Sequence, residues 1–182
     1  MSSIHWLFAP AAIAIAATAP CYAVEYLNLA QAQQACFGDV KDASFVSSEL
    51  TLSAEQAKAI EKASGARVRL RQVKLWRVEA NGKPSGWFVV DEVLGKHEFI
   101  TWCLALNADG SVKTLEVMDY RETYGDEIRR ADWRRQFVGK QNGAKLKLDD
   151  DIKNISGATL SCRHITDGVK RLLATYEIAI KR

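Results

Sequence analysis

The chain has 182 residues, of which 48% are hydrophobic and 26% charged, and it carries a net charge of +3 at pH 7. This composition is typical of a globular protein and excludes a fibrous or wholly disordered chain, and the length suits one ordinary domain. Basic residues alternate with acidic ones even in the densest cluster, residues 127–137, which argues against a nucleic-acid-binding surface.

The first 23 residues have the pattern of a secretory signal peptide. An apolar run ends in the tripeptide CYA at 21–23, which puts small residues at the two positions that signal peptidase recognises. Pro20 disfavours a lipoprotein acylated on Cys21, and Pro10 and Pro20 would break an uncleaved membrane-spanning helix. We therefore expect cleavage after residue 23 and an exported chain, periplasmic or otherwise extracytoplasmic, of residues 24–182.

Two short helices and then an antiparallel sheet are expected in residues 28–120. Helical spacing covers residues 28–38, and a second helix within residues 50–65 has Ser53 as its N-cap and Gly65 as its stop. From residue 66 the hydrophobic period changes to two, in four segments parted by short turns: 66–80, 86–95, 98–107 and 111–120. The first segment changes phase, as a bulged strand does, and the NGK that follows it suits a hairpin turn. Consecutive strands joined by tight turns predict an antiparallel sheet.

Helical periodicity returns after the sheet. Residues 127–139 predict one helix that ends near Gly139, and a long C-terminal helix is predicted to begin at the SGAT motif, residues 156–159. The apolar residues of the latter fall on one face, which we expect to pack on the sheet: Ile165, Val169, Leu172, Leu173, Tyr176 and Ile180. The predicted fold class is α+β, an antiparallel β-sheet flanked by helices, in a single domain.

Three cysteines, Cys36, Cys103 and Cys162, remain after removal of the predicted signal peptide. Their wide separation excludes a CxxC redox motif and a zinc ribbon, and no other metal-ligand cluster occurs in the sequence. Two alternatives remain open: buried free thiols that act as small hydrophobic residues, or a disulfide such as Cys36–Cys162 with one thiol left over.

The SGAT motif lies where an anion can bind. Backbone N–H groups in the first turn of a helix have no intrahelical partners, and the helix dipole adds partial positive charge there. Gly157 lets a ligand approach the backbone, and Ser156 and Thr159 supply hydroxyl groups. A phosphate group fits such a place; the alternative is that Ser156 is only the N-cap of the helix.

The run DIKNISGATLS, residues 151–161, resembles the flavinylation motif of the FMN-binding domain family. That family includes the covalently flavinylated subunits of the sodium-translocating NADH:quinone reductase and of the related ferredoxin-oxidising complex. The resemblance is strongest over residues 86–176, where RETYGDE is similar to the ETPG-type loop of the family and FVGK to its Phe-x-Gly-Lys element.

The resemblance implies FMN as the cofactor, joined through its phosphate to the Thr159 hydroxyl by a separate flavin transferase. It implies a cofactor site that combines the helix start with the loop after the sheet: Ser156, Gly157, Ala158, Thr159, Leu160, Ser161, Glu122, Thr123, Tyr124 and Gly125. Tyr124 stands where proline is common and is expected to cover the flavin ring. Lys153 stands where the family has an acid, three residues before Ser156, and is expected to contact the phosphate.

Cofactor chemistry is the whole functional prediction, because the sequence shows no catalytic Ser-His-Asp arrangement and no acid/base pair suited to a substrate. We treat His97 and the tryptophans as packing or surface residues, with Trp133 a candidate for stacking on the flavin. The expected function is electron transfer between a membrane donor and an extracytoplasmic acceptor, rather than turnover of a specific substrate. The alternatives are a non-covalent FMN-binding reductase or flavin carrier, and a flavin-free module that binds an anion or a partner protein.

Overall fold

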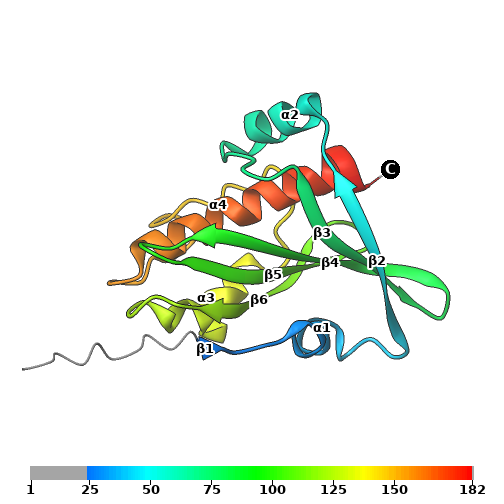
Figure 1. The fold of residues 1–182 in the computed structure, drawn as a ribbon, viewed down its shortest axis with the longest axis horizontal. Helices are drawn as coiled ribbons and strands as arrows, with labels where there is room; N and C mark the ends of the chain where they lie inside the picture. Colours follow the sequence, from blue (N-terminus) through cyan, green and yellow to red (C-terminus); the bar gives the residue numbers. More distant parts are fainter. Residues whose placement is uncertain (1–23, 182) are drawn as a thin grey trace, which may run out of the picture.

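A computed structural model describes residues 24–181, within which six strands form one antiparallel sheet in the order β1-β6-β5-β4-β3-β2 (Figure 1). The strands are β1 (Val24–Glu25), β2 (Ala43–Thr51), β3 (Gln72–Ala80), β4 (Lys83–Leu94), β5 (Phe99–Asn107) and β6 (Val112–Tyr120). The predicted signal peptide, 1–23, lies outside the described residues. The expected α+β class and antiparallel sheet are confirmed, and β1 and β2 are strands that the sequence did not predict.

The hairpin between β3 and β4 has the predicted turn. Asn81 and Gly82 both have positive φ, 51° and 70°, which is the backbone of a type I′ turn and matches the twist of the strands it joins. The expected bulge also occurs, between Val78 and Glu79, where the pairing of β3 with β4 shifts. Residues 66–71, which the sequence assigned to this strand, precede it and form an irregular segment.

Helices cover both faces of the sheet. Alternate residues of β5 belong to different cores: Trp102 and Leu104 pack with the long helix α4 (Thr159–Thr175), and Cys103 and Ala105 with the short helix α1 (Leu29–Phe37). Helix α2 (Ala54–Ser64) packs against α4, on the side of the sheet opposite α1 (Figure 1). The sheet is therefore the middle layer.

Local sequence explains where α1 and α2 begin and end. Both have a capping box, in which the side chains of Asn28 and Ser53 each accept the N–H of a glutamine three residues later. Gly65 ends α2 in the left-handed conformation, with φ 70°, as predicted.

Helix α4 carries the predicted apolar face, and all six residues named for it are buried. It continues into a π-helical turn, η3 (Tyr176–Ile180). A Cβ added to Gly168 would lie 2.7 Å from the Trp102 ring, so this glycine lets the helix approach the sheet closely. Among the described residues, no helix has the length and apolar character needed to cross a bilayer.

The single helix predicted for residues 127–139 is wrong. Three short pieces replace it: η1 (Asp126–Arg129), α3 (Ala131–Arg134) and η2 (Arg135–Phe137). Arg130 is extended, with ψ 132°, and interrupts the helical backbone. In an unbroken helix Ile128 and Trp133 would point about 140° apart, at about 100° per residue. The break lets both side chains enter the core.

Candidate FMN site

The loop after β6 and the start of α4 meet in one groove with a volume of about 340 Å³, within the usual range of small-molecule sites. It lies at the end of the sheet where β4 turns into β5. Its lining residues are Lys96, His97, Glu122, Thr123, Tyr124, Gly157, Ala158, Thr159, Leu160 and Ser161. Most of the residues that the sequence assigned to the cofactor are therefore neighbours in space, although the loop and the helix start are more than thirty positions apart in the chain.

Tyr120, at the end of β6, ties the loop to the helix. Its hydroxyl donates to the backbone carbonyl of Tyr124 at 2.6 Å and lies 3.3 Å from the Ser161 hydroxyl on α4. Gly125 fits between them with φ 95°, and a Cβ there would lie 2.7 Å from the Tyr120 hydroxyl and 3.0 Å from the Ala158 side chain. Only glycine combines that backbone conformation with so close an approach. Gly125 does not line the groove, but it allows the loop to pack closely against Tyr120 and the start of α4.

The start of α4 is open toward the groove. Ala158 occupies the N-cap position, and no described side chain caps the first turn, so the hypothesis that Ser156 is only an N-cap is wrong. Gly157 has φ 87°, and no described atom lies within 4 Å of the position that a Cβ would take. Thr159 is exposed, and its hydroxyl accepts a hydrogen bond from the Asn154 amide at 3.3 Å. Uncapped N–H groups, open backbone and an accessible hydroxyl together fit the phosphate of FMN.

Tyr124 is the most exposed large hydrophobic side chain of the groove, with 80% of its surface accessible. With Leu160, which is also exposed, it offers a flat apolar surface next to the polar helix start. An isoalloxazine ring has apolar faces and polar edges, so this pairing of surfaces suits it.

Two residues that sequence reasoning left out, Lys96 and His97, also line the groove. Glu122 holds them there, because its carboxylate accepts the backbone N–H groups of His97 and Glu98. Burial raises the pKa of Glu122, but the N–H groups of Glu98, His97 and Lys96 outweigh it, and the net pKa lies below the ordinary 4.5. Glu122 therefore fastens the β4–β5 turn to the loop.

Replacing Glu122 with alanine should weaken FMN binding by roughly tenfold, because two backbone donors at the turn lose their acceptor. Glutamine keeps one acceptor oxygen and should lose less. Fluorescence titration of FMN into protein made without a flavin transferase measures the effect. Glu92→Ala, an exposed change on β4, is the control. Equal affinities for the alanine variant and the parent would show that the turn does not shape the site.

The pH dependence of stability follows from the lowered pKa of Glu122 in the folded protein. The contribution of Glu122 to the free energy of unfolding is present above the ordinary pKa and declines as the pH falls through the folded value.

Lys153 and Trp133 lie beside the groove rather than in it. The indole N–H of Trp133 donates to the Lys153 carbonyl at 2.7 Å, and both residues line a neighbouring cavity with Asn154. Trp133 is buried against Phe137 at 5.1 Å between ring centroids, so its expected role in stacking on the flavin is not supported. The motif aspartate, Asp151, accepts the N–H groups of Lys147 and Leu146 and binds Lys140, interactions that lower its pKa.

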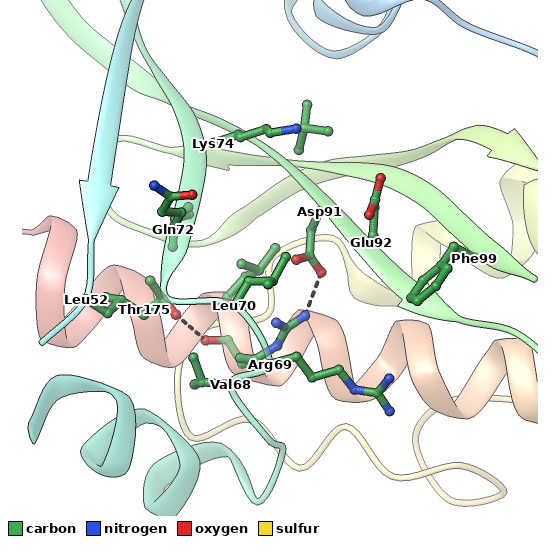
Figure 2. A pocket seen from close by; sticks show the side chains of 14 residues that line it. Leu52, Val68, Arg69, Leu70, Gln72, Lys74, Asp91, Glu92, Phe99 and Thr175 are labelled. Atoms are coloured by element: carbon green, nitrogen blue, oxygen red, sulfur yellow. Dashed lines mark hydrogen bonds and ion pairs between the residues drawn. The ribbon is translucent and has the colours of Figure 1, made fainter. Parts of the chain in front are cut away.

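A separate cavity of about 260 Å³ lies between α4, β3, β4 and the segment 68–72 (Figure 2). It shares no lining residue with the groove. At its base Asp91 and Arg171 form an ion pair of 2.6 Å, drawn as a dashed line to Asp91 in Figure 2. Its lining mixes apolar with charged side chains and includes no open helix start, which only the groove of these two offers to the phosphate of FMN. No group of His, Cys, Asp and Glu in residues 24–181 is arranged to hold a metal ion.

The chain is an α+β protein whose small-molecule groove lies between a loop that leaves an antiparallel sheet and the start of the C-terminal helix. Residues 95–174 match the model of the FMN-binding domain family; this part of the chain is an FMN-binding domain, and its cofactor is FMN. The matched segment contains the whole lining of the groove.

Two solved structures are similar in fold. NqrC from Shewanella oneidensis is 19% identical over 75% of this chain and 64% of its own, with a TM-score of 0.47. The corresponding component of the Na⁺-translocating NADH-quinone reductase from Parabacteroides distasonis is 14% identical over 86% of each chain, with a TM-score of 0.50. The chain thus spans less than two thirds of the Shewanella protein. Comparison with curated proteins gives no match.

Proposed function

We propose that this protein is an exported electron-transfer flavoprotein that carries FMN on Thr159. The observation that carries the proposal is the groove itself, in which the exposed Thr159 hydroxyl stands at an uncapped helix start within the matched FMN-binding segment. Bound FMN supplies the redox chemistry, and the chain holds its phosphate at α4 and its ring against Tyr124 and Leu160.

The Thr159 hydroxyl is suited to a phosphoester link. Its oxygen would bond to the flavin phosphorus and its proton would leave, so the donor must carry a leaving group on that phosphate. A separate flavin transferase that uses such an activated flavin nucleotide is the expected maturation partner. A covalent link suits an exported protein, because FMN that dissociates outside the cytoplasm is lost.

Electron relay is the function that this site supports best. The groove brings hydroxyl, backbone N–H and apolar groups to the cofactor, and two of its titratable side chains, Lys96 and His97, are exposed. Such a site holds a flavin and leaves its edge open to a partner. The similar Parabacteroides protein is part of an NADH-quinone reductase, which supports a membrane redox complex as the partner. In the proposal such a complex is the donor, and the acceptor is an extracytoplasmic protein.

A non-covalent FMN protein of the same fold is the second candidate, and the lysine at position 153 favours it. The family motif has an acid at this place, and Lys153 instead adds positive charge close to the helix start. The match to the FMN-binding family speaks against the third candidate, a flavin-free module.

The proposal predicts a yellow exported protein that begins at Val24 and exchanges electrons without a substrate of its own. The full-length gene should be expressed with a flavin transferase, and the exported fraction sequenced from its N-terminus. After photoreduction, stopped-flow mixing with artificial acceptors should show rapid reoxidation, and NADH should give no saturable turnover. An N-terminus at Met1 would contradict export. Brisk saturable NADH oxidation would make the protein a self-contained reductase.

A further inference from the structure

Two buried thiols face each other on the α1 side of the sheet. The Cys36 sulfur, on α1, lies 3.8 Å from the Cys103 sulfur on β5, and the two residues are 2% and 0% exposed. Cys162, the third cysteine of the described residues, belongs to the α4 core across the sheet. The Cys36–Cys162 pairing that the sequence left open is therefore contradicted, because the sheet separates these residues.

We propose that Cys36 and Cys103 form a disulfide in the exported protein. The inference rests on the export part of the proposed function, since disulfides persist in oxidising compartments. The two thiols lose two protons and two electrons and gain one S–S bond. The electrons go to the disulfide of a protein thiol oxidant, which becomes a dithiol. One thiolate attacks that disulfide to give a mixed disulfide, and the second thiolate then displaces the oxidant.

The surroundings of the two sulfurs indicate their order of reaction. Cys36 borders a surface groove that is also lined by Asp39 and Lys113, whereas Cys103 is enclosed in a central strand. Cys36 is thus the sulfur that an oxidant reaches, and Cys103 the one that completes the bond. The hydrogen bond with Cys36 and burial raise the pKa of Cys103 well above its ordinary value. Exchange therefore takes place before α1 has fully packed on the sheet.

A cross-link at this place would hold a helix that is weak alone. Helix α1 has nine residues, fewer than an isolated helix needs in water, and it depends on its packing against Val78, Phe88 and Met118. The bond would close a loop that contains α2 and strands β2 to β4, so it would restrict the unfolded chain strongly. Helix α1 would then stay attached to the sheet even when its packing contacts break locally.

Thiol mapping of the exported full-length gene product tests the proposal. Acid-quenched protein, denatured and alkylated without reduction, should carry one label, on Cys162, and three after reduction. Trypsin should release the peptide 24–41 joined to 97–113. Reduction should lower the Tm by roughly 5–15 °C. Cys162→Ala is the matched control and should keep the cross-link, whereas Cys36→Ala should leave both remaining thiols open to alkylation.

Three labels on the exported protein, or a cross-link through Cys162, would overturn the proposal. Failure of export is a different result: the chain then keeps its first residues and stays in the reducing cytoplasm. For that case the purified full chain is unfolded and then refolded in the presence of diamide, so that both thiols are accessible before α1 packs. A 24–41 to 97–113 cross-link then supports the pairing independently of location, and its absence refutes it.

Discussion

Thr159→Ala should remove all flavin from the denatured protein when the chain is made with a flavin transferase. Alanine has no oxygen to form the phosphoester, and the helix start that holds the phosphate is unchanged. In-gel fluorescence after denaturation should fall to background, and the tryptic peptide 154–163 should lose its flavin mass. The native variant should still take up free FMN, because the open backbone at Gly157 and the surface of Tyr124 and Leu160 remain.

Ser156→Ala is the matched control for Thr159→Ala, since it removes an exposed hydroxyl three positions earlier in the same motif. It should keep the fluorescent band. An alanine variant at 159 that stays as fluorescent as the parent would show that the flavin is attached elsewhere. A parent chain that loses its colour on denaturation would establish the non-covalent alternative.

Asp91→Ala should cost about 3 kcal/mol of unfolding free energy, the largest stability effect that we expect of a single charge removal. Asp91 and Arg171 pair at 2.6 Å, with side chains only 17% and 13% exposed, so the change leaves a largely buried guanidinium without its carboxylate partner. Burial raises the pKa of Asp91 although Arg171 opposes the shift. The cavity therefore disfavours the charged carboxylate more than the guanidinium stabilises it.

The double variant Asp91→Leu/Arg171→Met should recover most of that loss, because an apolar pair of similar size needs no compensation for buried charge. Urea unfolding of the parent, Asp91→Leu, Arg171→Met and the double variant gives a double-mutant cycle for the pair, and Asp91→Ala is measured beside them. Glu177→Ala is the comparison, since its pair with Lys181 is 43% and 56% exposed and should contribute less than about 1 kcal/mol. A single Asp91 variant as stable as the parent would mean that water reaches Arg171 freely.

The parts of the fold that could be predicted from sequence are those whose burial follows one clear period. Strands β3 to β6 alternate between two cores, and α4 presents one apolar face, so local pattern and tertiary packing agree. Strand β2 could not be predicted, because it is a sheet edge with most side chains exposed and its alternation does not last beyond its first four residues. The break at Arg130 could not be predicted either: its neighbours favour a helix, and only the need to bury both Ile128 and Trp133 opposes one.

The candidate site divides in the same way. Its loop and helix start could be found because a sequence motif carries them. Lys96 and His97 could not, since they reach the groove only through the hydrogen bonds that Glu122 makes to a turn 24 and 25 positions earlier in the chain. A contact that depends on one acidic side chain so far along the chain produces no periodic pattern in the sequence. The placement of Lys153 beside a different cavity likewise depends on the Trp133 indole, which no local pattern specifies.

The close approach of Gly168 to Trp102 fixes the position of α4 on the sheet, and with it the position of Thr159. Nine residues of helix separate this contact from Thr159, a length of roughly 13 Å that the hydrogen-bonded backbone keeps constant. The number of helical residues between Gly168 and Thr159 therefore sets where the Thr159 hydroxyl lies, and the loop before the helix has little influence on its position. One inserted residue between the two points would turn Thr159 by about 100° and move it away from Tyr124. Insertions among residues 141–143, which are exposed and lie outside this helical segment, would leave the attachment point where it is.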